Sequence, residues 1–213
     1  MPGLSPDQIA AAGLDDWRLL GAHLRARFAT GSFTAGLAFV TAITEAAEQA
    51  NHHPDVVLTY PYVELRLISH DVGHLTDRDV NLARSISALA REQGVAARPA
   101  ALTLCDIALD TADPARIAPF WAALLTGDAT AVTGDEVQLP DGGVLWFQHS
   151  APGETPQQRF HLDVWVPPEV AADRIQSALD AGGRMKDDSR APSFVVLADP
   201  DGNHACVCTS QGR

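Results

Sequence analysis

The amino-acid sequence predicts an α+β protein made of two domains with different architectures. In the first half, two helical patterns enclose two strand-like runs, which predicts an α-β-β-α domain with its helices on one face of an antiparallel sheet. In the second half, a pattern of strand, helix and further strands occurs twice, which predicts a pair of βαβββ units. The small residues and the proline of Gly94–Ala100 separate the two patterns. We therefore expect domains at residues 1–94 and 102–213, joined by a linker at 95–101.

The main helix of the first domain is predicted from apolar periodicity and from the residues at its ends. A short helix around Pro6–Ala12 and extended structure near His23–Phe28 precede it. Ser32 is the expected N-cap, and Pro54 ends the helix because it disfavours helical geometry at His53. The apolar stripe with helical spacing consists of Phe33, Leu37, Val40, Ile43 and Ala47.

Two strands and a second helix complete the first domain. Val56–Leu58 is a short strand candidate, and the residues from Tyr62 to His70 alternate between apolar and polar. The apolar face holds Val63, Leu65 and Leu67, and the polar face holds Glu64, Arg66 and His70. The second helix begins at Thr76, which forms a capping box with Asp79 three residues later. Its apolar stripe is Leu82, Ile86 and Leu89.

The internal repeat sets the expected elements of the second domain. A strand at Asp106–Asp110 leads to Asp113 and Pro114, the N-cap and first residue of a helix. In the second copy, a strand at His161–Val166 leads through Pro167 and Pro168 into another helix, closed by Gly182. Each copy then passes a turn, Asp141–Gly143 or Asp199–Asn203, into a strand at Val144–Gln148 or His204–Cys208.

Composition and charge exclude several classes of partner. The 213 residues are 46% hydrophobic and 20% charged, which is typical of a globular protein. The formal net charge of −12 argues against nucleic acid or an anionic membrane as partner, and no apolar run approaches the ~20 residues that span a bilayer. The N-terminal residues lack a signal-peptide pattern, and three cysteines (Cys105, Cys206 and Cys208) cannot form a closed disulfide framework. We therefore expect a cytoplasmic protein.

Three histidines of the first domain suit proton-transfer chemistry. His52 and His53 precede a proline at the exit of the main helix, and His70 ends the polar face of a strand that must pack against that helix. Histidine has an ordinary pKa near 6.5, so its neutral and charged forms are both accessible at cellular pH. The alternatives are solvated loop positions for His52 and His53, a strand-end cap for His70, or a metal site.

The residues around these histidines resemble the pterin-4a-carbinolamine dehydratases. The resemblance runs from about Leu4 to Gln93 and rests on the blocks Glu48–Pro54, Ser69–Asp71 and Leu75–Ala83, together with Tyr60. It implies a lyase of tetrahydrobiopterin biosynthesis or recycling that dehydrates 4a-hydroxytetrahydropterin to quinonoid dihydropterin and water without a metal or organic cofactor. The catalytic residues it implies are His52, His53 and His70, with the first and third as proton carriers.

The same resemblance implies a homo-oligomer, dimer or tetramer, and further contacts to the pterin. The weaker candidates for substrate binding are Glu48, Tyr60, Asp71, His74 and Asp79. Asp79 matches a motif position of the family, but its capping-box role explains it without catalysis. His74 stands where the family more usually has a small residue, so it is either a fourth pocket imidazole or a solvated loop histidine.

The second half resembles the glyoxalase-like branch of the vicinal-oxygen-chelate superfamily, over Leu102 to about Thr209. The resemblance rests on Asp113–Trp121, Arg159–Asp163 and Leu197–Asn203. Metal-dependent members hold a divalent ion with histidines and glutamates. By position, His161 matches a ligand, Asp106 stands where the first copy supplies one, and Cys206 replaces a glutamate. Zinc tolerates sulfur, but buried cysteines are also plain small hydrophobes, so we do not expect a tightly held divalent metal.

We expect the second domain to be a sheet curved around a cleft. Asp106 and His161 should face that cleft from equivalent strands, with Trp121, Trp146 and Trp165 as candidate walls. Two other functions stay open for the whole chain. The first is a binding or assembly module without catalysis. The second is a metal-dependent lyase or dioxygenase whose main chemistry takes place in the second domain.

Overall fold

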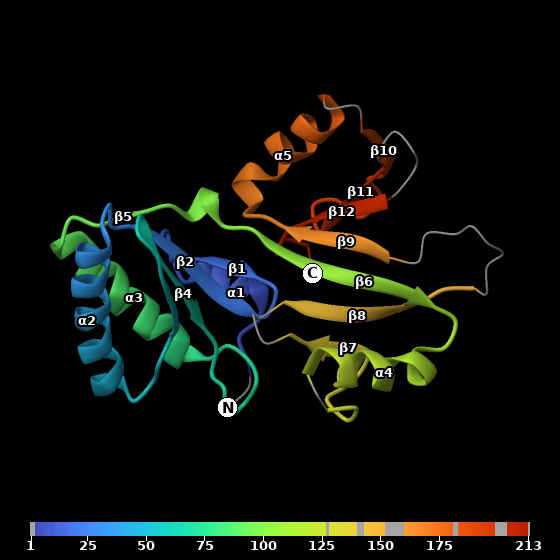
Figure 1. Ribbon diagram of the computed structural model, residues 1–213. Coiled ribbons are helices and arrows are strands. Elements are labelled where there is room, and N and C mark those ends of the chain that lie inside the picture. The colour runs from blue at the N-terminus through green and yellow to red at the C-terminus, as the bar shows by residue number, and fades with distance from the viewer. Residues whose placement is uncertain are drawn as a thin grey trace. The chain divides into compact units, whose positions relative to one another are not determined.

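The computed structural model describes residues 3–126, 128–139, 143–151, 160–180, 183–198 and 204–212. The chain folds into two compact units (Figure 1). The first unit contains Met1–Thr103 with the short segments Pro167–Glu169 and Ser210–Arg213, and the second contains Leu104–Val166 and Val170–Thr209. Each unit has its own sheet, so the predicted α+β class is confirmed.

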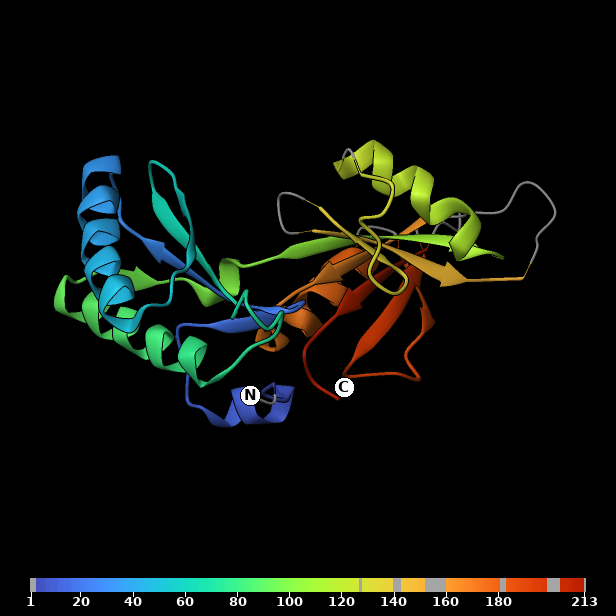
Figure 2. The same cartoon turned by 90° about the horizontal axis from the view of Figure 1, so that it is seen from below.

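The first unit is an antiparallel sheet with helices packed on its apolar face. The strands follow the order β1-β2-β4-β3, and β5 pairs with β2. Helices α2 and α3 lie side by side (Figure 1, Figure 2). The elements are α1 (Pro6–Ala11), β1 (Arg18–Leu20), β2 (His23–Ala29), α2 (Phe33–Ala50), β3 (Asp55–Leu58), β4 (Tyr62–Leu67), α3 (Asp77–Glu92), β5 (Ala96–Ala97) and a 3-10 turn at Pro99–Ala101.

Alternation along β4 creates the buried face of this sheet, as the sequence predicts. The side chains of Val63, Leu65 and Leu67 are fully buried and lie in one core with Phe39 of α2 and Ile86 of α3. Complete burial of such a side chain contributes about 1.5–3 kcal/mol. This core therefore fixes the two helices against the sheet.

The apolar stripe predicted for α2 is partly wrong. Ser32 does cap the helix, because its hydroxyl accepts a hydrogen bond from the backbone N–H of Ala35. The buried residues of α2, however, are Gly36, Phe39, Ile43 and Ala47, whereas Phe33 and Leu37 are 52% and 53% exposed. The helix has more apolar residues than one face can bury, and Gly36 lets the chain approach Leu58 so closely that a Cβ would lie 2.5 Å from its Cδ1.

Two further predictions about the first unit need correction. Strand β4 ends at Leu67, and His70 lies in the following turn, because Ser69 forms an isolated bridge with His74 and its carbonyl accepts the N–H of Gly73. The segment expected to be only a linker contains β5, whose residues pair with Phe28 and Ala29 of β2. Its first residues therefore belong to the sheet of the first unit.

The second unit contains two copies of a strand, a helix and further strands, as the sequence predicts, but in the described residues α5 is followed by three strands and α4 by two. Its sheet has the order β10-β11-β12-β9-β6-β8-β7, with the first strands of the two copies, β6 and β9, paired antiparallel at its centre. Each half has a core of its own, with α4 in one and α5 in the other. The elements are β6 (Leu104–Thr111), α4 (Pro114–Thr126), β7 (Glu136–Gln138), β8 (Val144–His149), β9 (Phe160–Trp165), α5 (Pro168–Asp180), β10 (Arg184–Asp187), β11 (Phe194–Ala198) and β12 (His204–Cys208).

Some predicted features of the second unit fall on residues that the structure does not describe. These are Asp141 and Gly142 of the first turn, Arg159, Gly182 and the turn Asp199–Asn203. The N-cap of α4 is described, and Asp113 Oδ1 accepts a hydrogen bond from the backbone N–H of Arg116 at 3.2 Å. Among the described residues, none of the helices has the length and apolar content needed to cross a membrane.

Candidate functional site

The carboxylate of Asp79 joins the chain segments that carry the predicted catalytic histidines. It is fully buried at the start of α3 and closes the predicted capping box, since Oδ2 accepts the N–H of Thr76 at 2.7 Å. The same oxygen accepts the hydroxyl of Ser69 at 2.7 Å. The other oxygen, Oδ1, lies 2.8 Å from Nε2 of His52. One side chain therefore connects the end of α2, the turn after β4 and the start of α3.

The end of α2 explains why His52 points at this carboxylate. Asn51 has a left-handed conformation, with φ of 46°, and the backbone N–H of His52 then donates to the carbonyl of Ala47. This hydrogen-bond pattern closes the helix and reverses the chain direction. The His52 side chain is 7% exposed, so its contact with Asp79 is almost entirely shielded from solvent.

His53 points to the surface instead. Its side chain is 55% exposed, and Nε2 lies 3.1 Å from Oε1 of Glu48, one turn back on α2. Strand β3 begins two residues later, and its first residue, Asp55, pairs with Arg66 near the end of β4. The sheet register therefore brings His53 to the same end of the sheet as the turn that carries His70.

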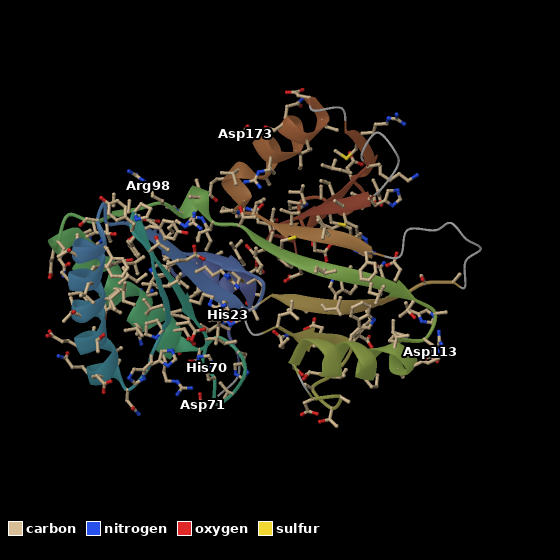
Figure 3. The ribbon with its side chains drawn as sticks, in the orientation of Figure 1. His23, His70, Asp71, Arg98, Asp113 and Asp173 are labelled. Carbon is tan, nitrogen blue, oxygen red and sulfur yellow. The ribbon has the colours of Figure 1, made fainter. Side chains whose placement is uncertain are left out.

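His70 and Asp71 lie in the exposed turn after β4 (Figure 3). Oδ1 of Asp71 accepts a hydrogen bond from Nη2 of Arg78 at 2.6 Å, and this bond lowers the pKa of Asp71 below its ordinary value. The turn thus offers an imidazole and an ionised carboxylate side by side at the surface.

His23, at the start of β2, is a further titratable residue of this region that no sequence motif indicated. Burial lowers the pKa of His23 to about 4, with further lowering by the positive charges of Arg25 and Arg66 and by His70. Figure 3 shows His23 in the same region of the first unit as His70. The pairing of Leu24 with Leu67 places the start of β2 beside the end of β4. His23 comes close to His70 only through the pairing of β2 with β4, which no local sequence pattern reveals.

Two of the weaker predicted residues lie apart from this group. Tyr60 is 69% exposed in the turn between β3 and β4, at the opposite end of β4 from His70. His74 forms the bridge with Ser69, and its ring lies against Gly3, where a Cβ would come within 2.9 Å of its Cδ2. His74 is therefore part of the packing that holds the turn.

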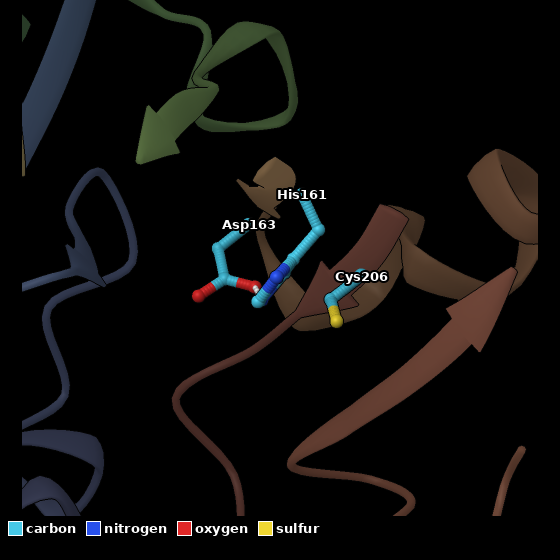
Figure 4. Close-up of side chains that lie close together, drawn as sticks. All are labelled: His161, Asp163 and Cys206. Carbon is cyan, nitrogen blue, oxygen red and sulfur yellow. Dashed lines mark ion pairs between the residues drawn. The ribbon is translucent and has the colours of Figure 1, made fainter. Parts of the chain in front are cut away.

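In the second unit, three potential metal ligands meet on one face of the sheet. They are His161 and Asp163 of β9 and Cys206 of β12, and their donor atoms all lie within 4.8 Å of one another (Figure 4). Burial raises the pKa of Cys206 to about 12, and the negative charge of Asp163 adds to this effect. Asp106 is not one of the three, and its Oδ1 accepts a hydrogen bond from the backbone N–H of Val144.

Comparisons with known proteins identify the families of both units. Residues 2–89 match the family of pterin 4 alpha carbinolamine dehydratase, and residues 106–208 match the glyoxalase-like domain family. The chain is 42% identical over 89 residues to a protein of Thermosynechococcus vestitus and 43% identical over 90 residues to one of Nocardia farcinica, both provisionally named pterin-4-alpha-carbinolamine dehydratase. These matches cover 41% of this chain and 94% and 95% of the relatives. The chain belongs to the pterin-4a-carbinolamine dehydratase family.

Two solved structures resemble the same region. One is described as a transcriptional coactivator/pterin dehydratase from Brucella melitensis, with 25% identity and a TM-score of 0.40 over 42% of this chain and 99% of the other. The second is described as a pterin dehydratase-like protein that is a RuBisCO assembly factor in the alpha-carboxysome. It has 23% identity and a TM-score of 0.31 over 36% of this chain and 93% of the other.

Proposed function

We propose that the first unit dehydrates 4a-hydroxytetrahydropterin to quinonoid dihydropterin and water. The observation that supports this most is the shared carboxylate of Asp79, which bonds both His52 and Ser69, the neighbour of His70. The segments that carry the family's histidines are thereby held together by one buried group. Membership of the dehydratase family supports the same reaction.

The reaction needs two proton transfers. A donor protonates the 4a hydroxyl, which leaves as water when the C4a–O bond breaks, while an acceptor removes the proton of N5 as the C4a=N5 bond forms. Each such transfer contributes about 10²–10⁴-fold to the rate when a side chain is positioned for it. Histidine serves for both steps because its neutral and protonated forms coexist near pH 7. The proposal requires neither a metal nor an organic cofactor.

The exposure of the side chains suggests how the roles are divided. His53 and His70 are exposed and able to contact a pterin, so we assign the proton transfers to them. His52 is buried against Asp79 and is a positioning residue in this proposal, which differs from the sequence-based expectation that His52 and His70 carry the protons. Glu48 lies beside His53, and Asp71 lies in the turn that carries His70. In this proposal both carboxylates support substrate binding.

A stopped-flow assay of the purified full chain tests the proposal. The 4a-carbinolamine loses water spontaneously, so the measured quantity is the increase in rate over buffer alone. The proposal predicts a saturable increase that depends on enzyme concentration. A folded chain that leaves the spontaneous rate unchanged would contradict it and would favour a binding or assembly role.

A further inference from the structure

The donor atoms in the second unit are brought together by strand register. Cys206 of β12 pairs with Asp163 of β9, so the two side chains leave the sheet on the same face. His161 is two residues from Asp163 on β9 and shares that face. Figure 4 shows the three side chains directed at one another. They supply one imidazole nitrogen, one carboxylate oxygen and one sulfur, all within 4.8 Å of each other.

The ring of His161 is held in a defined orientation between two carboxylates. Its Nε2 lies 3.6 Å from Oδ1 of Asp163, and its Nδ1 lies 3.5 Å from Oδ1 of Asp110 on β6. Among the described residues, that buried oxygen of Asp110 has no hydrogen-bond partner. The ring of Trp146 meets the imidazole edge-on, with centroids 5.6 Å apart. The arrangement leaves Nε2 directed at the group formed by Asp163 and Cys206.

We propose that His161, Asp163 and Cys206 bind a divalent ion of the zinc class, and that Asp110 orients His161 through its other ring nitrogen. Histidine ligands of metals commonly donate their second ring N–H to a carboxylate, which is the position that Asp110 occupies. The two carboxylates place negative charge around a half-buried imidazole, and a bound cation offsets that charge. Among the described residues Oδ1 of Asp110 makes no hydrogen bond to another group, so it is available to accept the Nδ1–H of His161.

The donor set selects the class of metal. Magnesium and calcium require several oxygen ligands, whereas zinc binds a mixture of nitrogen, oxygen and sulfur in a tetrahedral arrangement. Three protein ligands leave the fourth position of such a site for water or a substrate. The glyoxalase resemblance of the sequence implied Asp106 as a ligand, but Asp106 is engaged with Val144, and Asp163 takes its place beside Cys206. A metal bound by these ligands would contradict our sequence-based expectation that the second domain holds no tightly bound metal.

Cobalt(II) is a suitable probe because it substitutes for zinc in tetrahedral sites and gives an absorption band when a thiolate binds it. The full chain is treated with a chelator, freed of it, and titrated with Co²⁺ and then with Zn²⁺. The proposal predicts about one equivalent of Co²⁺ with a sulfur-to-cobalt charge-transfer band and visible bands of tetrahedral geometry, and displacement of both by Zn²⁺. Chains that show no such bands under saturating Co²⁺ would overturn it.

Variants distinguish this site from other metal-binding groups in the chain. Cys206→Ala and His161→Ala should lose the charge-transfer band, while Cys105→Ala, which removes another cysteine, should keep it. Asp110→Asn should weaken binding by roughly 10- to 100-fold, the usual effect of removing a partner of a ligand histidine. Asp106→Asn should bind normally. Loss of the band in Asp106→Asn but not in Asp163→Asn would contradict the ligand set, and circular dichroism of each variant confirms that it is folded.

Discussion

At the scale of single residues, the first unit depends on a buried carboxylate that has both a structural and a positioning role. Asp79 accepts the backbone N–H of Thr76, as the third helical residue of a capping box does, and its carboxylate also contacts Ser69 and His52. A buried carboxylate that accepts several hydrogen bonds fixes the positions of the groups that donate them. The rotamer of His52 and the position of the His70 turn therefore depend on the same group.

Replacement of Asp79 should cost more than an ordinary helix cap. Asp79→Ala leaves buried donors unpaired, and we expect it to lower the free energy of unfolding by about 2–4 kcal/mol, against ~0.5–2 kcal/mol for a simple cap. Urea unfolding followed by fluorescence measures this loss. Asp77→Ala is the matched control, because Asp77 is exposed in the same helical turn, and it should cost less than about 1 kcal/mol. Equal losses in the two variants would show that the additional bonds contribute nothing.

The proposed division of roles among the histidines predicts different kinetic defects. His53→Ala and His70→Ala should each lower kcat for dehydration by about 10²–10⁴-fold with little change in stability, because both side chains are exposed. His52→Ala should lower stability by about 1–3 kcal/mol and reduce kcat less than either. His149→Ala, an exposed histidine of the second unit, should leave the rate unchanged. A large kcat loss in a stable His52 variant would instead make His52 a proton carrier.

The low pKa of His23 predicts a pH dependence of stability. Its pKa is about 4 in the folded chain and near the ordinary 6.5 when unfolded, so acid protonates the unfolded chain first. The contribution of neutral His23 to the free energy of unfolding is fully present above pH 6.5 and is lost as the pH falls from 6.5 to 4. The loss amounts to up to about 2 kcal/mol after allowance for partial exposure. His23→Gln should remove this part of the acid sensitivity, and an NMR titration of the ring that gave a pKa above about 6 would contradict the assignment.

At the scale of secondary-structure elements, local signals predicted the helices and central strands well. The signals that predicted these helices are local, because each involves residues only a few positions from the helix end that it marks. They are Ser32 and Pro54 for α2 and the Thr76–Asp79 capping box for α3. Strands β1 and β5 were missed because two or three residues show no periodicity, and they exist only through pairing with β2. The end of β4 was placed too late because the bridge between Ser69 and His74 determines it.

The difference between local sequence signals and long-range pairing also explains which site residues could be predicted. His52, His53 and His70 were identified from motif spacing, but the bond between His52 and Asp79 joins residues 27 positions apart and depends on packing of α2 against α3. In the second unit, Asp163 was overlooked in favour of Asp106. The two residues pair directly across β6 and β9, and only the further pairing of Asp163 with Cys206 decides between them.

From the exposed apolar side chains on the first unit we propose that the chain forms the homo-oligomer that its family resemblance implies. Phe33 and Leu37 on α2 are 52% and 53% exposed, and Val57 on β3 is 49% exposed. Contact with a second copy of the chain would bury such side chains. Leu37→Glu should shift the full chain to a smaller species in sedimentation analysis, whereas Glu45→Gln, on the same helix, should not. A wild-type chain that sediments as a monomer at all concentrations would contradict the proposal.

At the scale of the whole molecule, the chain combines a dehydratase-family unit with a glyoxalase-like unit, each with its own sheet and core. The proposed proton chemistry uses the first unit, and the proposed metal site uses residues of the second. The two proposals therefore fail independently. Cys206→Ala should lose the cobalt charge-transfer band and keep the wild-type dehydration rate. His53→Ala should keep the band and lose most of the dehydration rate.

The dehydration rate of a double variant tests the central claim most directly. His53→Ala/His70→Ala removes both proposed proton carriers while the buried pair of His52 and Asp79 is retained. Stopped-flow measurement on the full chain should show a wild-type rate well above the spontaneous rate, and a folded double variant that is indistinguishable from buffer. A double variant that keeps the wild-type rate would contradict the account.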